Sequence, residues 1–344
     1  MKNSANSVRQ IVAGLVLFSF SLVRPGLAQD SENLKPFVGT WAFELPDGNP
    51  AWLGVFDAAE GPSASLLWSV GNPRTVNDLQ VAEGKLTFKR NVKWRPYGNP
   101  KDVWVLKQPI TVVHDGDGLT LYAEQTALNA PEQSPQKIEL VGTKMPPMPP
   151  RPDLAQVKFS TPIQLFDGKT LQGWKLSNPD KKNGWRAEDG VLINETPKTD
   201  FSAYGEFGNL VTERSFGDFR LSIEYNVEKN ANSGIYLRGT YEAQVVDRDS
   251  RMQGRSGPGA IFGRITPSEN AGNPGGEWNK YVLTLVDRHI SVQLNGKLVI
   301  DNQPLMGCTG GGINADDTKP GPIFLQGDHT SVLYRNIILE PVAK

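Results

Sequence analysis

Residues 232–247 read NSGIYLRGTYEAQVVD, and this stretch predicts two adjacent β-strands joined by a tight turn. Successive strand residues point to opposite faces of a sheet, so Tyr236 and Arg238 are expected to share one face. In the second strand Glu242 and Gln244 alternate with apolar residues. A guanidinium, a carboxylate and an amide on one face indicate either a polar binding surface or a solvated salt bridge.

Short alternating runs recur along the rest of the chain, and no segment shows a sustained helical period. Asp-Gly and Asn-Gly turn signals separate these runs, and the chain contains 35 glycines and 26 prolines. The alternating runs lie at 65–70, 85–89, 118–123, 218–227, 280–286, 290–294 and 331–339. This spacing predicts an all-β fold of sandwich or barrel type.

A proline-rich segment marks the predicted domain boundary. Residues 145–152 read MPPMPPRP, which predicts an extended and stiff connection, and we assign 145–160 as a linker. We expect a small β-barrel or β-sandwich domain of unknown role at 34–144 and a larger all-β domain at 161–342. The first domain holds five of the eight tryptophans, which serve either core packing or sugar binding.

The first 28 residues have the pattern of a secretory signal peptide. Lys2 and Arg9 make a positive start, 11–23 is an almost unbroken apolar run, and 26–28 reads GLA, a small-x-small cleavage pattern. The apolar run is too short for a comfortable membrane span. We therefore expect an exported chain, periplasmic or extracellular, with no transmembrane segment after cleavage.

Charge and cysteine content exclude several classes of protein. Removing the three basic residues of the signal segment from a total of 36 leaves 33 against 37 acidic residues, a net charge of −4. With no basic run, the sequence gives no support for a nucleic-acid partner. Cys308 is the single cysteine, so an intramolecular disulfide is excluded, and we expect its thiol to be inert rather than nucleophilic.

Seven segments, in this order, carry a family resemblance. They are LFDGKTLQGW from residue 165, GDFRLSIEYNV from 217, NSGIYLRG from 232, YEAQVVD from 241, GAIFGRITPSENAGNPGGEWN from 259, VQLNGKLV from 292 and RNIILEP from 335. Together they resemble the DUF1080 family, now described as 3-keto-disaccharide hydrolases. The resemblance covers nearly all of the second predicted domain and none of the first.

The resemblance implies a concanavalin-like jelly roll, with two curved antiparallel sheets and a concave carbohydrate face. It also implies an exported bacterial enzyme that cleaves glycosides oxidised to a ketone at C3. The ketone acidifies the C2 proton, a base removes it, the enolate expels the C1 substituent, and water adds back. The sugar, the linkage, and the choice between elimination and direct hydrolysis stay open.

That chemistry needs a base near C2, a donor or cation for the enolate oxygen, and an acid for the leaving group. Strand parity places Glu224 on the polar face of 220–226. If this strand neighbours the next two, a pair of carboxylates flanks Arg238. We therefore predict Glu242 as base or acid, Glu224 as its partner and Arg238 as the clamp. The alternative for Glu224 is an exposed ion pair with Arg220 or Lys229.

Further candidates come from the loops and from aromatic residues. His329 follows Gln326-Gly327-Asp328 at a strand end and is a candidate proton shuttle, although the family more often reads Gln-Asp-His without the glycine. Tyr236 and Trp278 are candidate sugar platforms, and core packing is the alternative for Trp278. The predicted substrate-binding residues are Gln244, Gln326, Tyr236, Arg264 and Trp278.

No motif requires a cofactor. Five loop carboxylates offer oxygen ligands for a structural or active-site divalent cation such as Ca²⁺: Asp247, Asp249, Asp316, Asp317 and Asp328. Zinc, phosphate-cradling and dinucleotide motifs are absent from the sequence. The expected partner is a glycoside, and the oligomeric state stays open. Two other interpretations remain: a non-catalytic carbohydrate-binding module on the same fold, and a cell-envelope interaction protein.

Overall fold

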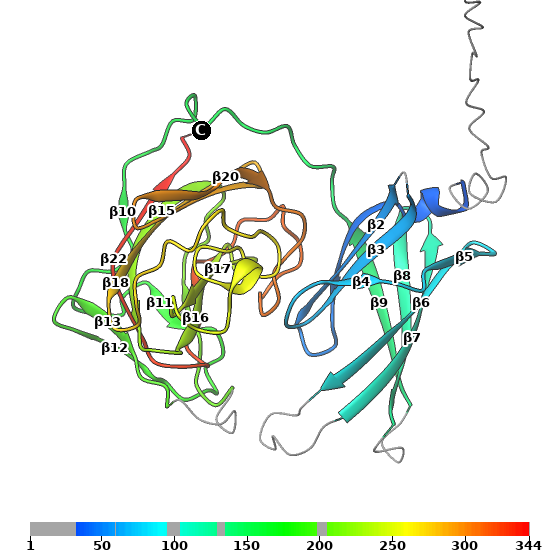
Figure 1. Ribbon diagram of the computed structural model, residues 1–344, viewed down its shortest axis with the longest axis horizontal. Coiled ribbons are helices and arrows are strands. Elements are labelled where there is room, and N and C mark those ends of the chain that lie inside the picture. Colours follow the sequence, from blue (N-terminus) through cyan, green and yellow to red (C-terminus); the bar gives the residue numbers. More distant parts are fainter. Residues whose placement is uncertain (1–31, 59, 95–103, 129–134, 198–204, 344) are drawn as a thin grey trace, which may run out of the picture.

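The chain forms one curled sheet from its first half and two facing sheets from its second half (Figure 1). The predicted signal segment at 1–28 lies outside the described residues. Within the described part of the chain, no helix is long and apolar enough to cross a membrane. The computed structural model describes residues 32–58, 60–94, 104–128, 135–197 and 205–343.

The first sheet is antiparallel and wraps around its own apolar core, and we call it the barrel. Its strand order is β4-β3-β2-β1-β9-β8-β7-β6-β5, and a short 3-10 helix, η1 (Lys35–Phe37), precedes it. Its strands are β1 (Gly39–Glu44), β2 (Pro50–Ala58), β3 (Gly61–Trp68), β4 (Arg74–Val76), β5 (Gln80–Ala82), β6 (Lys85–Trp94), β7 (Trp104–Asp115), β8 (Gly118–Ala127) and β9 (Gln136–Lys144).

The second half is a sandwich of two antiparallel sheets. The five-stranded sheet contains, in order, β11 (Trp174–Leu176), β14 (Leu210–Thr212), β21 (Phe324–Leu325), β16 (Asn232–Leu237) and β17 (Tyr241–Val246). The eight-stranded sheet contains, in order, β12 (Trp185–Glu188), β13 (Val191–Asn194), β22 (Val332–Pro341), β15 (Phe219–Val227), β18 (Trp278–Val286), β19 (His289–Leu294) and β20 (Lys297–Pro304), with β10 (Ile163–Gln164) pairing with β22.

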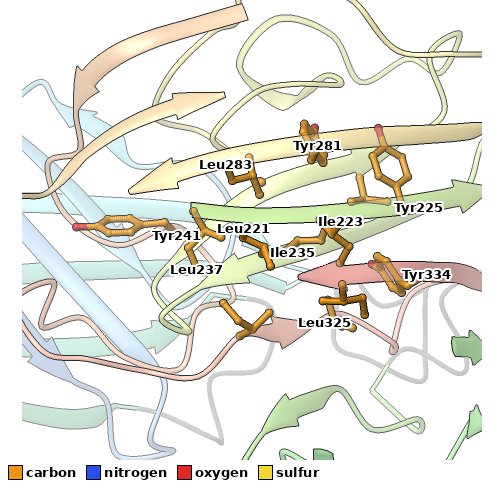
Figure 2. Packing of buried hydrophobic residues seen from close by; sticks show 14 of the residues in the cluster. Leu221, Ile223, Tyr225, Ile235, Leu237, Tyr241, Tyr281, Leu283, Leu325 and Tyr334 are labelled. Atoms are coloured by element: carbon orange, nitrogen blue, oxygen red, sulfur yellow. The ribbon is translucent and has the colours of Figure 1, made fainter. Parts of the chain in front are cut away.

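Strict alternation in the sequence produces the core between these two sheets. Along β15 every second residue from Phe219 to Val227 is buried, and the residues between them are partly exposed. Leu221, Ile223 and Leu283 from one sheet meet Ile235 and Leu325 from the other (Figure 2). The predicted all-β fold with a two-sheet sandwich is therefore confirmed.

Truncating Leu283 tests this assignment of faces. Leu283 is fully buried, so Leu283→Ala leaves a cavity and should lower the free energy of unfolding by about 3 kcal/mol. The next residue, Thr284, points away from the core, and Thr284→Ala should cost about 1 kcal/mol or less. Urea unfolding followed by circular dichroism measures both variants. Equal losses would contradict the two-faced arrangement of β18.

Candidate functional site

The pair of strands predicted from residues 232–247 is present. β16 and β17 pair antiparallel, so that Tyr236 lies opposite Glu242 and Gly234 opposite Gln244. Five residues of the two strands face the sandwich core, and they are Ile235, Leu237, Tyr241, Ala243 and Val245. Glu242 and Gln244 therefore lie on the opposite face, which we call the outward face of the five-stranded sheet.

One row of side chains on this outward face joins two aromatic rings to a carboxyl group. Phe324 on β21 lies beside Tyr236, and their rings stack with centroids 4.4 Å apart. The Tyr236 hydroxyl lies 3.0 Å from Oε2 of Glu242 and 3.1 Å from the carbonyl oxygen of Gly310. The Tyr236 hydroxyl has a single proton, so it can donate a well-aligned hydrogen bond to only one of these two oxygen atoms at a time. The Tyr236 hydroxyl donates to Glu242, and this hydrogen bond favours the ionised form of the carboxyl.

A second row holds two amide side chains, those of Gln244 and Gln326, on either side of Gly234. The backbone N–H of Gln326 donates to the carbonyl oxygen of Gly234, which pairs on its other side with Gln244. A side chain at position 234 would collide with the Glu242 carboxylate, so glycine makes room for it. The Oε1 atoms of Gln244 and Gln326 are buried without a hydrogen-bond partner in the described structure. A buried acceptor without a hydrogen-bond partner is unusual in a folded protein.

Glu242 itself is an acid held out of water, with only 4% of its surface exposed. Burial raises the pKa of Glu242 to about 8, the hydrogen bond with Tyr236 opposes that rise, and the charge of Asp328 adds to it. At neutral pH the carboxyl is therefore mostly protonated. A small rise in pH converts it into a base.

The loop after β21 brings a second titratable pair toward the same face. The His329 Nδ1 atom lies 2.6 Å from Oδ1 of Asp328, and both side chains are partly buried. Gly327 fixes this loop, because its N–H donates to Oδ1 of Asn209 at 2.7 Å and its carbonyl oxygen accepts from Thr196. Gln326 pairs with Gly234, and Gly234 lies against the Glu242 carboxylate, so the loop that carries Asp328 and His329 begins beside Glu242.

Arg238 does not lie where alternation predicted it. The turn begins at Arg238, whose φ of 56° lies in the left-handed region, so the alternation of β16 ends there. Its guanidinium lies 5.6 Å from the ring of Tyr241, on the core side of the sheet. There it donates to the carbonyl oxygen of Asp317 at 2.8 Å and lies 3.8 Å from Asp218. The prediction that Arg238 lies beside Glu242 on the same face of the sheet was therefore wrong.

The predicted pairing of Glu224 with Glu242 was also wrong in geometry. Glu224 is on β15, in the eight-stranded sheet, and it points away from the core. Its carboxylate accepts hydrogen bonds from Arg335 at 2.8 Å and from Asn336 at 3.0 Å. The Arg335 guanidinium also lies 3.9 Å from the ring of Trp278, so Trp278 packs in that same cluster. The predicted platform role of Trp278 beside Glu242 therefore does not fit its position.

Arg264 and Cys308 meet at the contact with the barrel. Arg264 donates to the carbonyl oxygen of Cys308 at 2.9 Å, and its guanidinium lies 4.3 Å from the Trp52 ring. The guanidinium of Arg264 therefore contacts other parts of the protein, which does not fit its predicted role in binding a sugar. Cys308 is fully buried, and burial raises the pKa of its thiol to about 12. A thiol in that state is a poor nucleophile.

The loop carboxylates form no metal cage in the described part of the chain, where no group of three or more His, Cys, Asp or Glu residues comes together. Asp247 is buried and accepts hydrogen bonds from the backbone N–H groups of Asn230 and Gly275. Asp317 is fully buried and lies 3.0 Å from Arg288. These two carboxylates therefore already serve protein donors.

The fold and the outward face define an all-β protein whose sandwich holds a buried acid beside two glutamine side chains with unpaired Oε1 atoms. Residues 161–340 match the family described as 3-keto-alpha-glucoside-1,2-lyase-like domain, which is just over half of the chain. The chain belongs to this family, and the resemblance predicted from the sequence is confirmed.

Three individual proteins are each similar to part of this chain. A 3-keto-disaccharide hydrolase of Bacteroides thetaiotaomicron is 28% identical over 145 residues, which cover 34% of this chain and 50% of that protein. The chain thus spans about half the length of this curated relative. A Parabacteroides distasonis structure provisionally described as a glycosyl hydrolase is 22% identical, with a TM-score of 0.42, and the match covers 53% of this chain and 94% of that one. A carbohydrate-binding module of Bacillus subtilis is 12% identical, with a TM-score of 0.33, over 49% of this chain and 95% of that one.

The raised pKa of Glu242 should appear in the pH dependence of stability. Between the ordinary pKa of 4.5 and the native value of about 8, the folded protein holds a proton that the unfolded chain has released. Stability therefore falls as pH rises through this window. Glu242→Gln removes this titration. Between pH 5 and pH 8, the free energy of unfolding of the variant should therefore rise relative to that of the wild type by on the order of 3 kcal/mol. Thermal unfolding across this pH range measures the gain.

Glu224→Gln is the matched control, with the opposite sign. Burial raises the pKa of Glu224, but the hydrogen bonds from Arg335 and Asn336 outweigh burial and lower it. The stability that Glu224 contributes is therefore present at neutral pH and lost in acid. Glu224→Gln should be less stable than the wild type at neutral pH and approach it as pH falls. The placement of Glu242 is contradicted if both variants change in the same direction.

Proposed function

We propose that this chain cleaves glycosides whose sugar carries a ketone at C3, with Glu242 acting on the C2 proton. The family to which the chain belongs and the name of the Bacteroides relative support this substrate class. The observation that carries the mechanism is the buried Glu242 carboxyl, hydrogen-bonded to Tyr236 and with a pKa of about 8. A base that works near neutral pH needs a pKa in this range.

The proposed reaction follows from the acidity that the ketone gives to C2. Ionised Glu242 removes the C2 proton, and the electron pair moves onto the ketone oxygen to form an enolate. The enolate re-forms the ketone as the bond from C1 to the leaving oxygen breaks, which leaves a double bond between C1 and C2. Water then adds across this bond, with its hydroxyl on C1 and a proton returned to C2, and the net change is hydrolysis.

Four other side chains have supporting roles in this proposal. Tyr236 orients the Glu242 carboxyl through their 3.0 Å hydrogen bond. The unpaired Oε1 atoms of Gln244 and Gln326 accept hydrogen bonds from sugar hydroxyls. His329, whose Nδ1 atom lies 2.6 Å from Asp328, gives a proton to the leaving oxygen. Glu224, Arg238, Arg264 and Trp278 have no part in this version of the site.

Replacing Glu242 with glutamine separates chemistry from binding. The amide keeps the shape of the side chain but cannot remove a proton, so release of the aglycone from a 3-keto-glucoside should fall by at least about 100-fold. Saccharide affinity should stay largely unchanged. A chromogenic release assay measures the first quantity, and isothermal titration calorimetry measures the second.

Glu224→Gln is the control for activity as well, and it should keep the wild-type rate because Glu224 lies in the other sheet. An equal loss in both variants would contradict the proposed site. Binding without turnover by the wild type would indicate a carbohydrate-binding module instead. Neither binding nor turnover would favour an interaction protein.

A further inference from the structure

A glycine-rich loop, residues 307–312 with the sequence GCTGGG, covers the hydroxyl end of Tyr236. The carbonyl oxygen of Gly310 accepts from Tyr236 at 3.1 Å, and Oγ1 of Thr309 accepts from the backbone N–H of Glu242 at 2.9 Å. A side-chain carbon at Gly311 would press on the Tyr236 hydroxyl. The 307–312 loop therefore touches both Tyr236 and Glu242.

The other side of the 307–312 loop rests on the barrel. The backbone N–H of Gly311 donates to the carbonyl oxygen of Ser69 at 3.0 Å. A methyl group added at Gly310 would overlap the backbone of Gly71, and one added at Gly307 would overlap the indole of Trp52. The loop is thus enclosed between the turn that follows β3 and the outward face of the five-stranded sheet.

Trp52 shows that the barrel is built for this contact. Along β2 its neighbours Ala51 and Leu53 point into the barrel core, so Trp52 points away from it. It is nevertheless only 2% exposed, because it packs in a second apolar cluster with Leu67, Cys308 and others, while Arg264 stacks on its ring. Without the sandwich, this large indole would face water.

The linker fixes the same arrangement from the other side of the contact. Arg288 donates to the carbonyl oxygen of Pro146 at 2.9 Å, and Asn302 donates to that of Pro152 at 2.7 Å. Arg288 is itself held by a buried ion pair with Asp317 at 3.0 Å, in the segment that follows the loop. The barrel cannot move away from the loop without breaking these bonds to the sandwich.

We propose that the barrel is a positioning element of the active site: through Trp52 and the turn at Ser69 and Gly71 it holds the 307–312 loop on Tyr236. The loop in turn keeps Tyr236 against Glu242 and keeps water away from the carboxyl. This inference rests on the proposed function for its effect on catalysis. Its structural part, the geometry and ionisation of Glu242, stands apart from any substrate.

Two variants at a distance from the reacting atoms test this role in the full-length chain. Trp52→Ala removes the barrel indole that packs against the 307–312 loop, and Gly310→Ala makes that loop collide with the backbone of Gly71. Gly217→Ala is the matched control, because a side-chain carbon there meets no atom within 4 Å. Turnover of a 3-keto-glucoside should show kcat lowered at least about tenfold in both test variants, with little change in KM. The pH profile of kcat/KM should shift to lower pH as water reaches Glu242.

A second readout works without any substrate. Carbon-13 NMR of labelled glutamate carboxyls, assigned with Glu242→Gln, follows the ionisation of Glu242 in each variant. The Glu242 pKa should fall by about one unit or more in Trp52→Ala and in Gly310→Ala, and stay unchanged in Gly217→Ala. This result supports the inference even if the wild type turns over no 3-keto-glycoside, an outcome that would overturn only the proposed function. A folded Trp52→Ala or Gly310→Ala protein with wild-type ionisation and kcat overturns the inference.

Discussion

The site depends on one costly arrangement, a carboxyl group kept out of water on the outward face of a β-sheet. An ionised carboxylate in such a place loses its hydration, and its side-chain partner is the neutral hydroxyl of Tyr236 rather than a cation. The protonated form of Glu242 is therefore favoured at neutral pH. The proposed acid and base chemistry of Glu242 and the pH dependence of stability both follow from this burial.

Several distant segments combine to produce that burial. Gly234 leaves space for the carboxyl, the pairing of β16 with β17 sets Tyr236 opposite it, and the 307–312 loop closes over the pair. The barrel then supports the loop through Trp52. The first half of the chain, whose role the sequence left unknown, thereby acquires a structural reason to be joined to the second.

Local features of the sequence predicted part of this site, and the errors have physical causes. The two-residue period is a local property, so the strand pair and the shared face of Tyr236, Glu242 and Gln244 could be predicted. Arg238 was misplaced because a left-handed turn residue interrupts that period. Glu224 was misplaced because parity identifies a face but not the sheet to which a strand belongs. The cover over Tyr236 was not predicted, since it joins residues 74 positions apart, although the run of glycines around Cys308 was a visible signal.

Infrared difference spectroscopy of the intact protein between about pH 3 and pH 10 tests the central claim most directly. A protonated carboxyl has a carbonyl stretching band that an ionised one lacks. For Glu242 this band should persist through neutral pH, vanish with a midpoint near its pKa of about 8, and be missing from Glu242→Gln. A midpoint near the ordinary glutamate value of 4.5, or the same band in the glutamine variant, would contradict the account.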